Sequence, residues 1–225
     1  MKKTSQKSQN VTYQNQILSA LFSPSFPIGA FSYSHGLEAA IAASLVIDTK
    51  TAEKWIKTCL VSGSGRNDAI IFAHAWRAEP DNRKELNEIA FALCASAERH
   101  QEMRELGASF HDIATRVYQV RVTNKHSMAY PVIAGAATRQ LNCELLLSLV
   151  FFLQSFANNL ISVVIRAVPL GQSEGQGILY RLIPWIEQLA NETIKASLGQ
   201  IGGHAFLADH MAIKHETMET RIYRT

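Results

Sequence analysis

Apolar side chains recur every three or four positions along this 225-residue sequence, and that spacing constrains the fold more than any other feature. It is the repeat of one face of an α-helix, whereas a half-buried strand would alternate at every second position. The repeat is visible in four stretches: Ile17–Phe22, Trp55–Leu60, Ile70–Trp76 and Leu86–Cys94. Glycine or proline interrupts it between such stretches, where helices end. We therefore predict an all-α fold, a single-domain helical bundle of about nine or ten helices.

The composition fits one globular domain with two distinct ends. Hydrophobic residues make up 47% and charged residues 18% of the chain, as in ordinary folded proteins. No internal repeat or low-complexity linker divides the chain. We expect a flexible polar N-terminus at residues 1–12, an all-helical domain at 13–203, and a C-terminal partner-docking segment of the same domain at 204–225. A β-branched patch at Val117–Val122 is open to either helix or strand.

Charge and cysteine content exclude several classes of protein. The formal net charge is only +3 and the basic residues are scattered, so no stripe suits nucleic acid. The cysteines are odd in number and form no CxxC pair, which argues against a disulfide framework and for a reducing compartment; they are Cys59, Cys94 and Cys143. No apolar stretch follows the basic first residues, so we expect no signal peptide.

One stretch, Leu145–Ile165, has the length of a membrane span. Its 21 residues carry no charge, and a span needs about 20 apolar residues. Unpartnered amides and hydroxyls are costly in hydrocarbon, and the sequence offers no second candidate span. The stretch nevertheless contains Ser148, Gln154, Ser155, Asn158, Asn159 and Ser162. We interpret it as the buried central helix of a soluble protein and expect no membrane partner.

Motifs for nucleotide and metal chemistry are missing. Neither Gly63–Gly65 nor Gly171–Gly177 has the glycines and lysine that a phosphate-binding loop needs, which argues against an NTPase. Histidines 204, 210 and 215 are spaced by six and five residues and fall on different faces of one helix. We expect these histidines to face solvent or a partner, and we predict no metal site and no cofactor.

Catalytic signatures are weak. Ser34, His35 and Glu38 lie within about one helical turn, which leaves a small helical serine hydrolase as an alternative function. No GxSxG elbow marks the serine as activated. A metal-binding helical protein is the other alternative. An i,i+4 charged face, which we interpret as a solvated helix surface, is formed by Glu98, Arg99, Glu102 and Arg104.

Three further segments stand out. Residues 23–38 are richer in proline, glycine and aromatic side chains than a simple connection, which favours a shaped recognition surface. Residues 169–176 predict a sharp corner between helices, with Ser173 and Gln176 at capping-box spacing. Near the C-terminus, a narrow apolar seam is formed by Leu207, Met211, Met218 and Ile222. Spacing alone leaves open whether this seam docks on its own domain or against a partner.

Four blocks, in order, resemble the urease accessory protein UreF family. SPSFPIGAFSYSHGLE at residues 23–38 is similar to the family pattern SP-x-x-P-x-G-x-F-S-Y-S-x-G-LE. Glu98 with residues 102–107 resembles the E-x-R-x-x-x-x-G region. Residues 151–166, followed by PLGQSEGQ, resemble the central helix and the R-x-x-P-L-G-Q-[ST]-x-G-Q corner. HE at 215–216 and RIYRT at 221–225 resemble the terminal HE-x-x-x-x-RLF-x-S.

The resemblance implies an all-helical, homodimeric, cytoplasmic protein without catalytic activity. Proteins similar to UreF bridge a UreD-like (also called UreH-like) accessory protein and the nickel-carrying GTPase UreG. They control GTP hydrolysis while nickel reaches the urease apoprotein. The chain would need no cofactor of its own, because the complex handles the nickel.

The resemblance also implies site residues on this chain. The partner-binding candidates are Pro27, Gly29, Phe31, Tyr33, Gly36, Glu38, His215, Glu216, Arg221 and Tyr223. The structural corner comprises Arg166, Pro169, Gly171, Gln172, Ser173, Gly175 and Gln176. Arg221 can pair bidentately with a carboxylate. The terminal motif departs from the pattern at Ile222 and Tyr223, and because both residues keep apolar bulk we expect the docking mode to survive.

Overall fold

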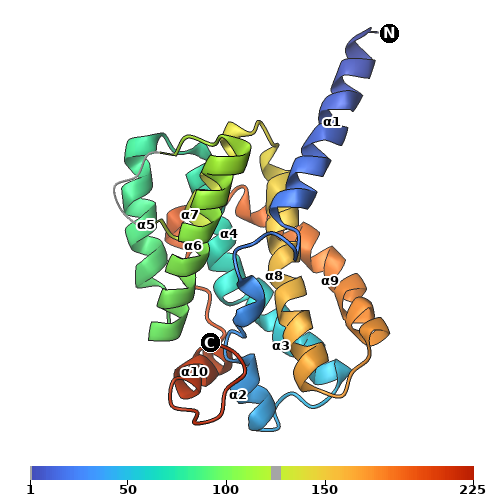
Figure 1. Ribbon diagram of the computed structural model, residues 1–225, viewed down its shortest axis with the longest axis vertical. Helices are drawn as coiled ribbons and strands as arrows, with labels where there is room; N and C mark the ends of the chain where they lie inside the picture. The colour runs from blue at the N-terminus through green and yellow to red at the C-terminus, as the bar shows by residue number, and fades with distance from the viewer. Residues whose placement is uncertain (1, 123–127) are drawn as a thin grey trace.

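The computed structural model describes residues 2–122 and 128–225, with side chains from residue 11 onward. Within these ranges the chain forms ten α-helices, three short 3₁₀ helices and no strand (Figure 1). The α-helices are α1 (Lys2–Leu21), α2 (Leu37–Ala42), α3 (Thr49–Val61), α4 (Ser64–Arg77), α5 (Arg83–Ala92), α6 (Ala97–Tyr118), α7 (Tyr130–Gln140), α8 (Leu145–Ala167), α9 (Gln172–Thr193) and α10 (Phe206–His215). The 3₁₀ helices are η1 (Ala30–Ser32), η2 (Pro80–Asn82) and η3 (Leu198–Gln200). The prediction of an all-α fold is confirmed.

Helix α8 runs through the middle of the bundle. It packs against α9, α4 and α3, and more lightly against α1, α2 and α7. Its residues Leu149, Leu153 and Leu160 are fully buried. Among the described residues, α8 is the one helix long and apolar enough to cross a membrane. Its packing on several sides is that of a central core helix, as predicted from the sequence.

The tightest helix pair is α4 with α7, and small side chains make the close approach possible. A Cβ added to Gly135 in α7 would lie 2.5 Å from the carbonyl oxygen of Phe72 in α4. Alanine side chains at positions 134, 136 and 137 are fully buried beside it. The rings of Phe22, Phe72 and Phe152 meet in the core with centroids 4.9 to 6.4 Å apart. Small side chains and aromatic rings therefore both fill the core.

The helix-to-helix corner lies where the sequence predicts it, but its cap differs. Helix α9 begins at Gln172, with Gly171 as the N-cap residue. The Gly171 N–H donates to Glu174 Oε2 at 2.8 Å, so Ser173 lies inside the helix and the predicted Ser173–Gln176 capping box is wrong. A Cβ on Gly175 would lie 2.4 Å from Ile165 Cδ1, so this glycine lets α8 and α9 approach.

The β-branched patch at 117–122 is neither a full helix nor a strand. Helix α6 continues through Tyr118, and Gln119 then adopts a left-handed conformation with φ of 57°. The backbone N–H of Val120 donates to the Ala114 carbonyl oxygen at 3.1 Å, which closes the helix end. Residues 120–122 form an irregular connection.

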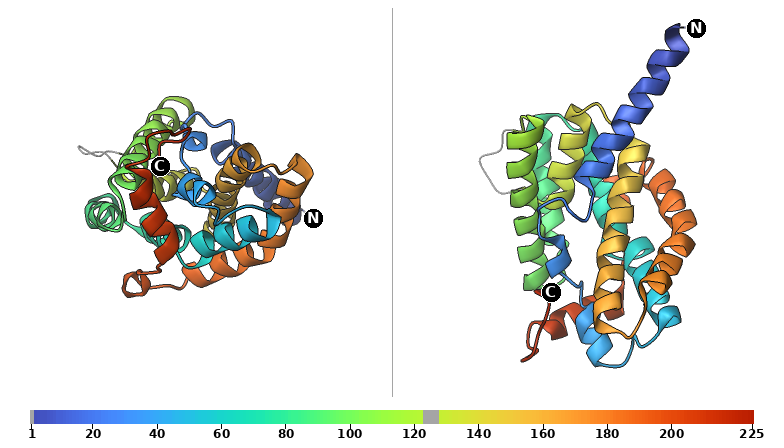
Figure 2. Two further views of the ribbon diagram at one scale, coloured as in Figure 1. Left: turned by 90° about the horizontal axis from the view of Figure 1, so that it is seen from below. Right: turned by 45° about the vertical axis from the view of Figure 1, so that its right-hand side comes forward.

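The two ends of the chain lie at opposite ends of the molecule. The first turns of α1 project away from the bundle, whereas α10 and the residues after it lie beside α2 (Figure 2). Residues 2–12 belong to α1, and their predicted flexibility stays a prediction. Of the apolar seam, Met211 is buried and Met218 is partly buried on the chain's own domain, whereas Leu207 and Ile222 are exposed, so docking of the seam against a partner stays a prediction.

Candidate functional site

Two segments singled out from the sequence meet at one end of the bundle. They are the aromatic loop (residues 23–36) and the tail (residues 216–225), which follows α10. The Arg224 N–H donates to the Ser32 carbonyl oxygen at 2.8 Å, and the Ser34 N–H donates to the Thr225 carbonyl oxygen at 3.0 Å. Thr225 Oγ1 also accepts from the Ser34 N–H at 3.0 Å. Thr225 is 1% exposed, so the tail ends in a buried polar socket.

Glu38, at the start of α2, fastens the middle of the tail. Its carboxylate accepts from the N–H groups of Ile222, at 2.7 Å, and Tyr223, at 2.9 Å. It also lies 2.9 Å from Nε2 of His215, at the end of α10. Burial alone would raise the pKa of Glu38, but the hydrogen bonds from His215 and the two tail N–H groups outweigh it. The pKa therefore lies below its usual value.

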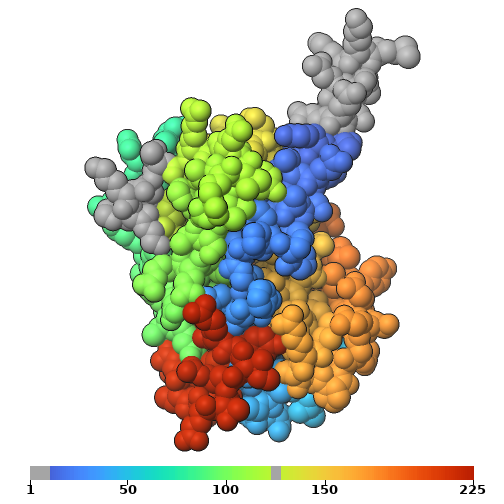
Figure 3. All heavy atoms as spheres, viewed as in Figure 1, coloured from blue at the N-terminus to red at the C-terminus, as the bar shows by residue number. Residues whose placement is uncertain are grey.

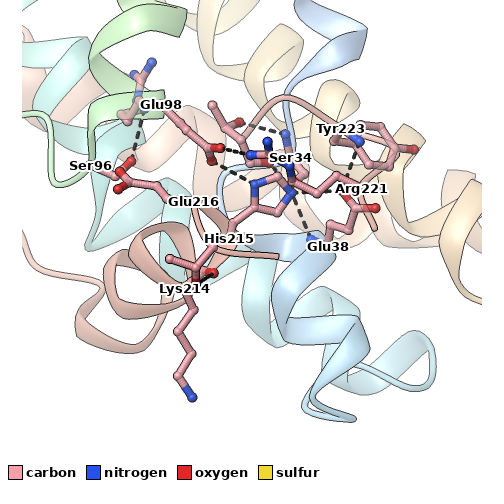
Figure 4. A network of polar contacts seen from close by, with 12 residues as sticks. Ser34, Glu38, Ser96, Glu98, Lys214, His215, Glu216, Arg221 and Tyr223 are labelled. Atoms are coloured by element: carbon pink, nitrogen blue, oxygen red, sulfur yellow. Dashed lines mark hydrogen bonds and ion pairs between the residues drawn. The ribbon is translucent and has the colours of Figure 1, made fainter. Parts of the chain in front are cut away.

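His215 connects α2 to α6. Its Nδ1 lies 2.8 Å from Glu98 Oε2, so each ring nitrogen faces a carboxylate (Figure 4). The side chain of His215 is 0% exposed. The second oxygen of Glu98 accepts from the guanidinium of Arg221 in the tail. We call Glu38, Glu98, His215 and Arg221 the tail clamp, since together they bind α2, α6 and α10 to the tail.

A second buried charge cluster lies directly behind the loop. Arg99 in α6 contacts Asp68 Oδ2 at 2.6 Å and Glu102 Oε1 at 3.4 Å, and His35 Nε2 lies 2.9 Å from the same Glu102 oxygen. Burial raises the pKa of Asp68. Burial opposes ionisation of Glu102 as well, but the charges of Arg99 and His35 leave its pKa below the usual value.

The predicted solvated face of α6 is therefore wrong for three of its four residues, because the Glu98 side chain in the tail clamp is also only 13% exposed. Arg99 and Glu102 are buried, at 9% and 2% exposure, whereas Arg104 is exposed. The i,i+4 spacing shows which charges are neighbours along one helix. It carries no signal for Asp68 and His35, which pack over them from other segments.

Tyr33 fixes the loop from the other side. Its hydroxyl donates to Glu105 Oε2 at 2.7 Å, and Arg224 of the tail reaches the same oxygen at 2.7 Å. Burial and the neighbouring carboxylate raise the pKa of Tyr33 well above its usual value. Tyr33 is consequently a neutral donor that holds the loop on α6.

A cavity of about 300 Å³, lined by both apolar and polar side chains, lies next to the end of the tail. His35, Asp68 and Arg99 line it, and so do Asp209 of α10 and the terminal Thr225. Among the described residues, no three His, Cys, Asp or Glu side chains are grouped to hold a metal ion. The predicted solvent or partner exposure holds for His204 and His210 but is wrong for the buried His215.

The residues of the hydrolase alternative do not form a catalytic arrangement. The Ser34 hydroxyl donates to the Thr225 carbonyl oxygen, Glu38 faces the tail and His35 faces Glu102. A nucleophile needs a base within hydrogen-bond reach, and Ser34 has its bond to the chain end instead. The three side chains instead connect the aromatic loop and α2 to the tail and to α6.

The ten partner-binding candidates divide into two sets. The buried set supports the tail from below: Tyr33, Gly36, Glu38, His215 and Tyr223. The set with exposed or partly exposed positions comprises Pro27, Gly29, Phe31, Glu216 and Arg221. Sequence reasoning missed Glu98 as a clamp residue and Thr225 as an anchor, because their partners lie more than 100 residues away.

These contacts define an all-helical protein in which charged side chains fasten the tail to the helical bundle. The UreF family model matches residues 46–183. The chain is 40% identical over 209 residues to the urease accessory protein UreF of Ruegeria pomeroyi, covering 92% of this chain and 95% of that protein. It is 43% identical over 203 residues to UreF of Cereibacter sphaeroides, covering 90% and 94%.

UreF 1 of Brucella abortus is 37% identical over 212 residues, covering 92% of each chain. The chain therefore belongs to the UreF family of urease accessory proteins. Proteins of this family assist the maturation of urease and are not enzymes themselves.

Proposed function

We propose that this chain is the scaffold that bridges a UreD-like or UreH-like accessory protein and a UreG-like GTPase. In that role it acts as a cytoplasmic homodimer and controls when GTP is hydrolysed. The nickel is the cargo of the assembly and passes to the urease apoprotein. Membership in a family of urease accessory proteins supports a role in urease maturation. The exposed surface around the tail supports the bridging role.

The observation that carries the bridging role is a set of exposed apolar side chains on fixed backbone. Phe206 is 82% exposed and Ile222 is 78% exposed, although Ala205 and Tyr223, next to them in the chain, are buried. Phe31, at 56% exposure, precedes the residue that pairs with Arg224. Figure 3 shows α10 and the tail capping one end of the molecule against α2 and the start of α6. Large apolar anchors held on ordered segments are typical of protein interfaces.

Size-exclusion chromatography with light scattering tests this function. The purified chain is mixed with the matching UreD-like and UreG-like proteins, with and without GTP and Mg²⁺. We expect a complex containing all three proteins whose mass changes with nucleotide. Failure of the three proteins to co-elute under any nucleotide condition would contradict the bridging role.

Two variants and one control locate the surface. We expect Phe206→Asp and Ile222→Asp to weaken the complex at least tenfold, because a carboxylate cannot enter an apolar pocket without a large desolvation cost. Tyr180→Asp is the control, since Tyr180 is 77% exposed on α9. Equal assembly by all three variants would place the partner elsewhere on the chain.

A further inference from the structure

The ring of His215 sits between two carboxylates with no other partner for either nitrogen in the clamp. Nδ1 lies 2.8 Å from Glu98 and Nε2 lies 2.9 Å from Glu38. A neutral imidazole has one N–H and one lone pair, whereas an ionised carboxylate offers only lone pairs. If both carboxylates are ionised, both contacts are hydrogen bonds only when the ring carries two protons.

Both carboxylates also accept hydrogen bonds from donors other than His215. Glu38 accepts from the N–H groups of Ile222 and Tyr223 at 2.7 and 2.9 Å. Glu98 accepts from the guanidinium of Arg221 on its second oxygen. Hydrogen bonds to the charged form favour that form. The extra proton of the clamp therefore belongs to the imidazole.

We propose that the tail is a proton-dependent latch, docked while His215 is an imidazolium and released when a rise in pH removes that proton. The charged groups facing the ring are Glu38 on α2, Glu98 on α6 and, through Glu98, Arg221 of the tail. With the proton, two carboxylates balance Arg221 and His215. Without it, the buried clamp keeps one uncompensated negative charge, and a lone pair of the ring opposes a carboxylate oxygen.

Release of the latch changes two features of the molecule. Thr225 leaves Ser34 and no longer lines the cavity of about 300 Å³, so His35, Asp68 and Arg99 become accessible to water. Ile222 also loses the backbone bond to Glu38 that fixes its position. The latch is a property of the isolated chain and does not depend on the bridging role, so its test needs no partner.

Nuclear magnetic resonance of the ¹⁵N-labelled chain tests the latch directly, between about pH 5.5 and about pH 9, the range that brackets ordinary imidazole titration. The ring nitrogens of His215 report its protonation, and the amides of Ile222 and Tyr223 report docking. We expect both ring nitrogens to be protonated while the amides are docked, and both changes to share one midpoint. Ile222 and Tyr223 amides that remain docked while the His215 ring is neutral, with only one of its nitrogens protonated, would overturn the proposal.

Glu98→Gln separates a proton requirement from a merely structural role. The amide oxygen introduced by this substitution can still accept from Arg221, while the amide N–H₂ group can donate to the lone pair of a neutral His215. We expect this variant to keep the tail docked at high pH, so that the release seen in the wild type is lost. His210→Gln is the control, because His210 is exposed on the same helix and should leave the midpoint unchanged. A release midpoint in Glu98→Gln equal to that of the wild type would contradict the latch.

Discussion

Two glycines of the aromatic loop share a left-handed backbone but differ in their surroundings. Gly36 has φ of 71°, and a Cβ there would lie 2.5 Å from the Ala212 backbone nitrogen in α10. Gly29 has φ of 77°, with nothing within 4 Å of such a Cβ. Gly29→Ala is expected to cost only the left-handed strain, about 1–2 kcal/mol. Gly36→Ala should lower the free energy of unfolding by clearly more than this and detach α10, because the α10 backbone at Ala212 would have to move away from the new methyl group.

Urea unfolding of both variants, with limited proteolysis of the last twenty residues, measures this difference. We expect faster cleavage near α10 in Gly36→Ala and a wild-type cleavage pattern in Gly29→Ala. Equal losses of stability in the two variants would show that strain alone makes these positions require glycine.

Protonation of Glu38 should release the docked tail at low pH. Its pKa in the folded chain lies below the ordinary glutamate value of about 4.3. The stabilisation by Glu38 is therefore complete above that ordinary value and is lost as pH falls through the lowered pKa. We expect the Ile222 and Tyr223 amides to leave their docked positions over this acid range. Asp48→Asn is the control, since Asp48 also has a lowered pKa but caps α3 on the surface. If Asp48→Asn changed the pH at which the Ile222 and Tyr223 amides leave their docked positions, their release would reflect unfolding of the whole chain and not protonation of Glu38.

Helix α6 carries two arginine–carboxylate pairs of opposite character. Arg99 is buried against Asp68 and Glu102, whereas Arg116 pairs with Asp112 on the exposed surface. Arg99→Met removes the arginine that two buried carboxylates share, which typically costs about 3–5 kcal/mol. Arg116→Met should cost less than about 0.5 kcal/mol. Urea denaturation followed by circular dichroism gives both values, and similar losses at the two sites would contradict the assigned role of the buried cluster.

The helices themselves were predictable because their signal is local. Apolar spacing within one stretch reports the face that is buried, and Leu18, Ile56 and Leu60 are fully buried as their spacing predicts. The cap of α9 was not predictable from Ser173 alone, because Glu174 offers the same backbone a competing charged acceptor. Capping patterns in the sequence do not decide which of two neighbouring polar residues, here Ser173 or Glu174, bonds to the backbone at the start of the helix.

The sequence marked the two segments that form the site, but it did not show that they contact each other. Unusual composition marked residues 23–38, and an apolar seam marked the region after residue 204. Their meeting depends on tertiary contacts, such as Glu38 with Tyr223 and Glu98 with His215. No periodic pattern encodes a pairing across more than 100 residues. The buried histidine was missed for the same reason, since its burial is created by α2 and α6.

At the scale of the whole molecule, the packed core and the proposed partner surface lie at different places along the long axis. The core lies around α8, the tail clamp lies at one end, and α1 leaves the body at the other (Figures 1 and 2). Leu18 and Leu21, in the last turn of α1, are fully buried, whereas Val11 and Tyr13 are 50% and 57% exposed. The part of α1 that stabilises the bundle is therefore its C-terminal end.

Removal of residues 1–10 should consequently change neither the unfolding free energy of the bundle, within about 0.5 kcal/mol, nor the assembly with the UreD-like and UreG-like proteins. Leu18→Ala should lower the unfolding free energy by about 2–5 kcal/mol, because it empties a fully buried site. Urea unfolding compares the two forms, and light scattering of the mixed proteins measures assembly. A truncated chain that is as stable as the full chain yet fails to assemble would place a partner on the projecting helix. The proposed surface around the tail would then be only part of the interface.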